Sequence, residues 1–122
     1  MRVPSDGSVG AKVGFFKYTS SNTSIDFNSV WISPEFGNLT VTGSAGLPWY
    51  DTGVKFQPDT WYDIKVHIDY TTGTMSAWIN GALAVSGVPC EPKSSSSTFF
   101  VGTSWWSSGP TSTAYFDNVL IY

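Results

Sequence analysis

The clearest hydrophobic pattern runs from Trp61 to Gly81. Within Trp61–Tyr70 every second residue is apolar and the residues between them are mostly polar or charged. Successive side chains of a β-strand point to opposite faces, so this period of two predicts a strand with one buried and one solvated face. A glycine turn follows, and Thr74–Asn80 predicts a second strand that ends in an Asn-Gly turn. The pattern therefore predicts an antiparallel meander.

The rest of the chain carries short apolar segments separated by turns rich in Gly, Pro, Ser, Thr and Asn, and no segment has an apolar repeat at helical spacing. Such segments favour strands over helices. We predict nine strands: Ala11–Lys17, Ile25–Ile32, Gly37–Thr42, Gly53–Phe56, Trp61–Tyr70, Thr74–Asn80, Leu83–Val88, Thr98–Ser104 and Thr113–Tyr122. Two antiparallel sheets packed face to face bury this many short strands, so the predicted fold is all-β, a jelly-roll-like sandwich.

Several elements of the second half have a common family pattern: a strand opened by Trp61-Tyr62, the turn Thr72-Gly73, the strand end Ile79-Asn80-Gly81, and the closing segment Tyr115–Tyr122 with the sequence YFDNVLIY. These elements resemble the concanavalin A-like lectin and glucanase superfamily, including laminin-G-like modules. The resemblance covers Tyr50 to Tyr122 and implies a jelly-roll-like sandwich. The motif residues form strands and turns, so they imply a fold rather than a site.

Length and composition predict one β-sandwich domain over residues 1–122, and this domain could be a fragment of a larger protein. Aromatic residues make up 16% of the chain and charged residues 12%, which argues against disorder. The net charge of −3 comes without a basic cluster, so the composition argues against nucleic-acid binding. No apolar run is long enough to predict a membrane span.

Catalytic chemistry has few candidate residues. Glycoside hydrolysis uses two carboxylates about 5–10 Å apart. The only glutamates, Glu35 and Glu91, lie beside prolines in predicted loops. On the strand Trp61–Tyr70, Asp63 and Asp69 are separated by about 20 Å at roughly 3.3 Å per residue. We therefore predict that the protein is not an enzyme, and a glycan hydrolase or lyase stays open as an alternative.

Glycan binding has better candidates, because sugar rings stack on aromatic side chains while amides, carboxylates and hydroxyls bind the sugar hydroxyls. Two loop-like segments, residues 46–51 and 105–110, offer both kinds of group, and a further tryptophan lies on the outward parity of its strand. The predicted ligand-binding residues are Trp49, Tyr50, Asp51, Trp78, Trp105 and Trp106. We expect Trp49 and one of the pair Trp105 and Trp106 to be solvent-accessible. Core packing is the alternative for each tryptophan.

The resemblance also implies a possible structural calcium ion, because carbohydrate-binding jelly-roll modules often hold one through carboxylate and carbonyl oxygens. Asp117 and Asn118 look like the closing Asp-Asn of such modules, with Asp6 or Asp26 as a further ligand. The alternative is that Asp117 hydrogen-bonds a neighbouring loop.

The closing residues Val119–Tyr122 are apolar on both parities, which predicts a strand covered on both faces with Tyr122 inside a sheet. In the superfamily the last strand pairs close to the N-terminal strand. Where that partner is missing, the exposed edge favours pairing with another subunit, so a homo-oligomer formed through sheet edges is possible.

Three function classes follow. The first is a non-catalytic, lectin-like carbohydrate-binding module, extracellular or surface-associated, with a glycan as its partner. The second is a structural or protein-interaction module, such as a capsid decoration, fibre or adhesion domain, for which the virion surface is a possible location. The third is a glycan-active enzyme. A concave aromatic patch with nearby amides favours sugar, whereas an apolar rim at a sheet edge favours a protein partner.

Overall fold

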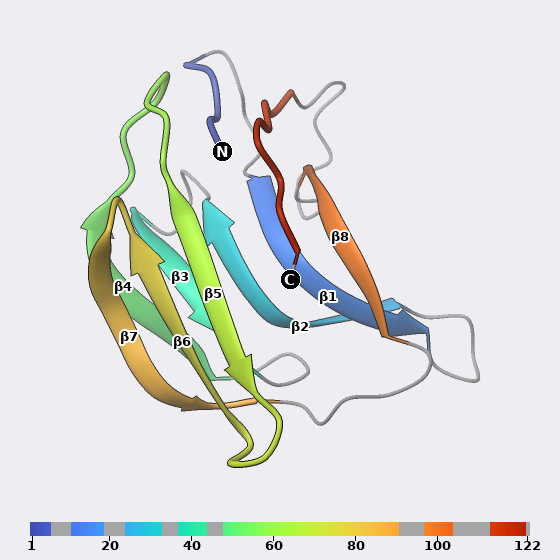
Figure 1. Ribbon diagram of the computed structural model, residues 1–122. Helices are drawn as coiled ribbons and strands as arrows, with labels where there is room; N and C mark the ends of the chain where they lie inside the picture. Colours follow the sequence, from blue (N-terminus) through green and yellow to red (C-terminus); the bar gives the residue numbers. More distant parts are fainter. Residues whose placement is uncertain are drawn as a thin grey trace.

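The computed structural model describes residues 1–5, 11–18, 24–32, 37–43, 48–90, 97–103 and 113–121. These residues form two antiparallel sheets and contain no helix (Figure 1). The strands are β1 (Ala11–Tyr18), β2 (Ser24–Ile32), β3 (Asn38–Thr42), β4 (Trp49–Lys55), β5 (Ile64–Asp69), β6 (Thr74–Ile79), β7 (Ala82–Pro89) and β8 (Ser97–Thr103). One sheet has the order β4-β3-β2-β1-β8 and the other β5-β6-β7. The predicted all-β fold with two antiparallel sheets is confirmed.

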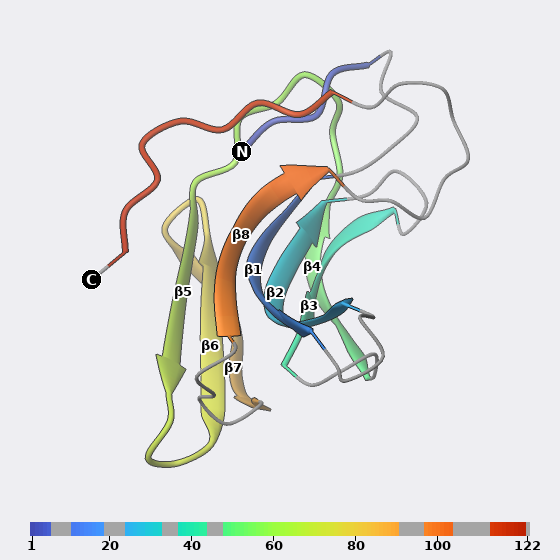
Figure 2. The same cartoon turned by 90° about the vertical axis from the view of Figure 1, so that its right-hand side faces the viewer.

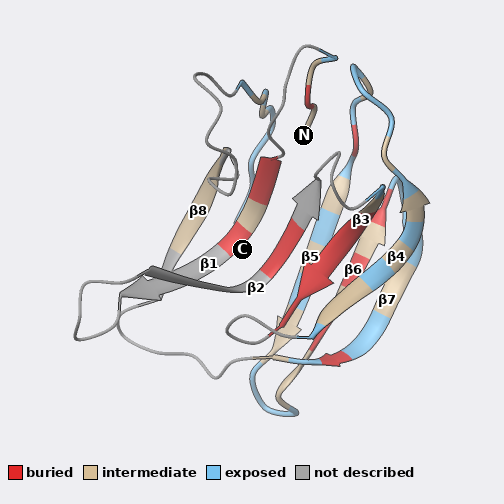
Figure 3. Cartoon of the chain, turned by 180° about the vertical axis from the view of Figure 1, so that it is seen from behind, coloured by how far each residue is buried: buried red, intermediate tan, exposed pale blue. Residues whose placement is uncertain are grey.

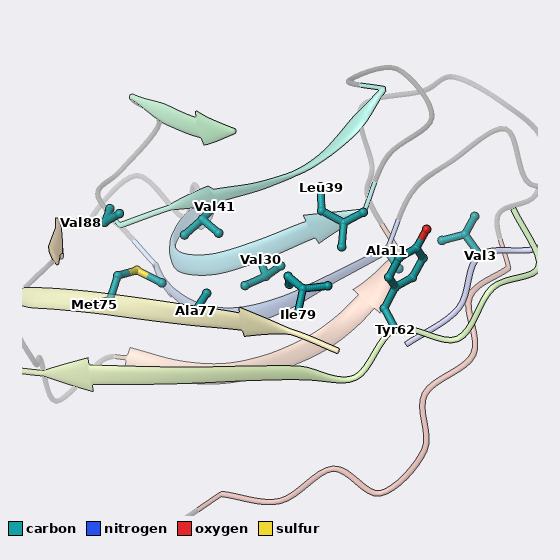
Figure 4. Close-up of a cluster of buried hydrophobic side chains, with 10 residues drawn as sticks. All are labelled: Val3, Ala11, Val30, Leu39, Val41, Tyr62, Met75, Ala77, Ile79 and Val88. Carbon is teal, nitrogen blue, oxygen red and sulfur yellow. The ribbon is translucent and has the colours of Figure 1, made fainter. Parts of the chain in front are cut away.

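The hydrophobic core lies between the two sheets (Figure 4). Leu39 and Val41 of β3 point toward Met75 and Ile79 of β6, and each of these side chains is at most 2% exposed. Alternation along both strands explains this packing, because the residues between them face outward. The period of two in the sequence therefore selected the buried face correctly.

Tyr62 lies at one end of the hydrophobic core, just before β5 of the three-stranded sheet. Its side chain is 4% exposed, and its hydroxyl accepts a hydrogen bond from the N–H of Gln57 at 2.7 Å and donates one to the carbonyl of Lys55 at 3.2 Å. A buried tyrosine hydroxyl needs such partners. These bonds tie the connection between β4 and β5 to the core.

Strand β4 begins earlier than the sequence predicts. Trp49, Tyr50 and Asp51 were expected in a loop before a strand at Gly53–Phe56, but they pair with β3 and belong to the strand. The register of the pair shifts between Asn38 and Thr40, and Gly53 has a φ of 71°. This bulge interrupts the alternation, because extra β4 residues face a single β3 residue. The interruption is why the pattern concealed the first half of the strand.

The predicted ninth strand, Thr113–Tyr122, is wrong over its described residues. It makes one isolated bridge, between Arg2 and Tyr115, and Tyr122 lies outside the described residues. Val119, Leu120 and Ile121 are 49%, 74% and 64% exposed, so this segment is not covered on both faces. Asn118 has a φ of 51°, which breaks the extended path after the bridge. Figure 2 shows the segment running away from β8.

Within the described residues, no helix is long and apolar enough to cross a membrane.

Candidate functional site

Two rows of residues cross the face of the five-stranded sheet that is turned away from β5–β7. In the first row, Lys12 of β1 and Thr40 of β3 lie opposite Trp31 of β2 in the strand register. Thr40 also lies opposite Asp51 of β4. In the second row Ser29, Thr42 and Trp49 pair across β2, β3 and β4. Phe100 of β8 lies on this face as well. Its neighbours along the strand, Phe99 and Val101, face the opposite side, and successive side chains of a strand alternate between the two faces. We call this set the outer-face site: Lys12, Ser29, Thr40, Thr42, Trp49, Asp51 and Phe100.

The floor of the outer-face site is polar and buried. Lys12, Ser29, Thr40 and Thr42 are 3%, 2%, 7% and 1% exposed, although they point away from the hydrophobic core. Figure 3 shows the burial continuing along β3. Burying a hydroxyl costs free energy unless it is hydrogen-bonded. The Oγ1 atom of Thr40 has no hydrogen-bond partner in the described part of the chain, so it is a donor and acceptor directed into this face.

One end of the outer-face site is an aromatic platform on β8. The ring of Phe100 lies over Gly102, where an added Cβ would come within 2.3 Å of the ring Cζ. The Nζ atom of Lys12 lies 5.1 Å from the centroid of the same ring, a cation–π distance. Figure 2 shows β1 and β8 bowed, with the hollow side turned away from β5–β7. The platform therefore lies on the hollow side of these two strands.

The other end of the site carries a fixed carboxylate and an indole. Asp51 accepts hydrogen bonds from the Nδ2 of Asn38 at 2.9 and 3.0 Å and from the N–H of Gly53 at 2.7 Å. The Gly53 N–H first, and Asn38 second, hold the pKa of Asp51 below its ordinary value, so the carboxylate is charged at neutral pH. Trp49 shares this face and is half-buried. The structure thus brings together two of the predicted ligand-binding residues.

Tyr50 and Trp78 do not join them. Tyr50 packs against the hydrophobic core, because it alternates with Trp49 and Asp51 along β4. Trp78 lies on the outward face of β6 as its parity predicts, but that is the opposite side of the molecule. Its ring has the Nζ of Lys65 at 5.0 Å from the centroid. Trp105 and Trp106 lie outside the described residues.

One exposed tryptophan was not among the predicted binding residues. Trp61 is 49% exposed, and the guanidinium of Arg2 lies 5.6 Å from its ring centroid and 4.5 Å from that of Tyr115. The polar parity of Trp61 in its strand was the available signal. The contacts of Arg2 with Trp61 and Tyr115 could not have been inferred, because they join residues that are far apart in the sequence.

The predicted calcium ligands lie at the beginning of the exposed C-terminal segment. The Oδ1 atom of Asp117 accepts a hydrogen bond from the N–H of Asn118 at 2.9 Å, and both residues are exposed. Asp6 and the side chain of Asp26 lie outside the described residues. Within the described part of the chain, no group of three or more His, Cys, Asp or Glu side chains is placed to hold a metal ion. Calcium binding stays a prediction from the resemblance.

No family model matches the chain, and neither a curated protein nor a solved structure is detectably similar to it. The superfamily resemblance therefore stays an expectation, and function has to be argued from the geometry of the site.

Proposed function

We propose that this protein is a non-catalytic carbohydrate-binding module that holds a glycan on the outer-face site. The observation that carries the proposal is the pairing, on one face of β4, of the exposed and hydrogen-bonded carboxylate of Asp51 with the half-buried indole of Trp49. Sugar rings combine apolar C–H faces with many hydroxyls, so they bind surfaces that pair aromatic rings with fixed polar groups.

Each residue has a distinct part in this proposal. Trp49 stacks on a sugar ring, and Asp51 accepts a hydrogen bond from a sugar hydroxyl. Asn38 and Gly53 already hold Asp51 in place, so little side-chain entropy is lost when the glycan binds.

The lowered pKa of Asp51 argues against a part as general acid. A general acid must carry its proton near the working pH, which requires a raised carboxyl pKa. The hydrogen bonds to Asp51 act in the opposite direction and keep it charged. Asp51 therefore fits the part of a hydrogen-bond acceptor.

We extend the proposal to a jelly-roll-like connection of the two sheets and to an extracellular or surface-associated location, as the concanavalin A-like resemblance implies. Fold-level analogy names no ligand, so glycan binding depends on the outer-face site alone.

The test compares retention on immobilised glycans, after a glycan array has selected the ligand. Trp49→Ala should weaken binding roughly two- to tenfold, the range expected for one lost aromatic contact. Trp78→Ala is the matched control, because it also removes a half-buried indole, from the opposite side of the molecule. A loss on Trp78→Ala without one on Trp49→Ala would move the site to the three-stranded sheet. Failure to bind any glycan on the array would reject the proposal.

A protein-interaction module is the second candidate. The exposed side chains of Val119, Leu120 and Ile121 favour it, because they form an apolar rim beside a sheet edge.

A further inference from the structure

A groove of about 900 Å³ separates β5 from the C-terminal segment. Ile64, Val66 and Ile68 of β5 form one wall, and Val13, Phe99 and Val101 of the five-stranded sheet contribute to the lining. Residues 116–121 form the other wall, and Met1 lies at the end of the groove. Figure 1 shows the C-terminal segment crossing the opening between β5 and β8, with the N-terminus between that segment and β5. We call this groove the slot.

The end of the slot is already occupied by an extended strand, the N-terminal segment. Met1 and Tyr62 exchange two backbone hydrogen bonds, of 2.8 and 2.9 Å. Arg2 and Tyr115 also exchange two, both of 2.9 Å. Residues that exchange both bonds form an antiparallel pair, so the N-terminal segment is antiparallel to both of its neighbours. A strand that continued the N-terminal segment beyond Met1 in the same direction would lie in the slot.

The edge of β5 that forms one wall presents backbone N–H and C=O groups to the slot. Asp63 bonds Asn80 on the β6 side, through its N–H at 2.9 Å and its carbonyl at 2.8 Å. Tyr62 bonds Met1 on the other side, so alternation directs the N–H and C=O groups of Ile64, Val66 and Ile68 into the slot. Among the described strands, β5 is an edge with β6 as its neighbour. An edge beside an apolar floor is a template for one more strand.

We propose that the slot binds one extended peptide strand of a partner polypeptide, antiparallel to β5, with its carboxyl end toward Met1. Positions opposite Ile64 and Val66 point inward, as Met1 and Tyr62 do, and take apolar side chains. The position next to Met1 in register faces Asp63 on one side and Asp117 on the other, so it takes a basic side chain.

Two further observations support this occupant. Burial lowers the pKa of the Met1 ammonium, while Asp63 and Asp117 act against that effect and raise it, so their negative potential reaches this end of the slot. The exposed Val119, Leu120 and Ile121 line the opposite wall, where a bound strand would cover part of their apolar surface. This binding mode, strand addition to a sheet edge, obtains affinity from main-chain hydrogen bonds and specificity from alternate side chains.

The direct test uses a synthetic peptide about as long as β5, which has six residues: Val-Thr-Val-Thr-Val-Lys with a free carboxylate. Amide hydrogen exchange of Ile64, Val66 and Ile68 should slow at least tenfold at saturating peptide. The control peptide is N-methylated at its valines, whose N–H groups would otherwise face β5. Unchanged exchange at all of these amides, or equal slowing with the N-methylated peptide, would overturn the proposal.

The register has its own test. Replacing the C-terminal lysine of the peptide by glutamate should weaken binding roughly threefold, the scale of exposed charge pairs. The difference should disappear in the double variant Asp63→Asn, Asp117→Asn. Equal affinities of the two peptides for the unmodified protein would show that the assigned register is wrong.

Two more measurements keep the proposal testable if the free peptide binds weakly. Fusing the same peptide ahead of Met1 raises its effective concentration and should raise Tm. No rise in Tm would count against the slot as a strand site. Light scattering could instead show a dimer in which the same three amides are protected before peptide is added. In that case the occupant of the slot would be a second copy of the chain and not a partner peptide. Neither result bears on glycan retention, so both are independent of the proposed function.

Discussion

The tip of the Phe100 ring lies over Gly102, two residues further along β8, so close that a Cβ at Gly102 would come within 2.3 Å of the ring Cζ. Glycine at this position is therefore what allows the aromatic platform to rest on the sheet. The platform in turn places a ring beside Lys12, at 5.1 Å from its Nζ.

Gly102→Ala should displace the Phe100 ring and destabilise the protein by about 1–3 kcal/mol, the usual cost of overpacking. Glycan affinity should fall with it, because the platform moves. Chemical unfolding and glycan retention measure the two effects. The same substitution made together with Phe100→Ala should cost little, since no ring remains to be displaced. An equal cost in both backgrounds would contradict the contact.

Asp51 gives a pH-dependent prediction. Its pKa in the folded protein lies below the ordinary value, so its hydrogen bonds stabilise the fold above the pKa of the unfolded chain. That contribution is lost as the pH falls below about 4 and through the lower folded value. Carboxyl chemical shifts followed by NMR should show the low pKa. Asn38→Ala should raise it, and an unaltered titration would exclude Asn38 as a cause.

Ile79 is the sharpest test of the core. Its side chain is 2% exposed between the sheets, so Ile79→Ala should cost about 2–5 kcal/mol in the free energy of unfolding. Leu83→Ala is the control, because Leu83 is 56% exposed on the neighbouring strand and should cost less than about 0.5 kcal/mol. Similar costs for both variants, measured by urea unfolding, would mean that the packing of β6 has been misassigned.

Tyr62→Phe removes a hydroxyl and keeps the ring. The variant should lose about 1–3 kcal/mol, because the N–H of Gln57 loses its partner in a partly buried environment. Thermal unfolding gives the change in stability, and exchange of the Gln57 amide reports the lost bond directly. Thr60→Val is a suitable comparison, since the Thr60 hydroxyl donates a longer bond of 3.2 Å at an exposed position. It should change stability by no more than about 0.5 kcal/mol.

The site could be predicted from the sequence only in part. The chemistry of Trp49 and Asp51 was visible, because an indole and a carboxylate close together indicate sugar binding. Their partners Lys12, Ser29 and Thr40 were not visible, because single polar residues in strands carry no signal until strand register places them side by side. Tyr50 was also among the predicted residues, but it packs against the core, because it alternates with Trp49 and Asp51 along β4.

The slot was not anticipated. The apolar ending of the chain predicted a strand covered on both faces, whereas Val119–Ile121 are exposed. Its position between β5 and the C-terminal segment depends on pairs such as Met1 with Tyr62, which join residues far apart in the sequence.

Where the alternation is regular, the sequence alone determined a strand and its buried face, because the period of two is a local property of the backbone: Met75, Ala77 and Ile79 could be assigned to one face before any partner was known. Only the tertiary structure decided which strands became neighbours. That choice depends on packing between distant segments, and it put Thr40 beside Asp51, turned Trp78 to the opposite side and left β5 as an edge. Both proposals depend on such long-range pairs, since the outer-face site adds β8 to the strands β1–β4 and the slot lies between β5 and residues from both ends of the chain.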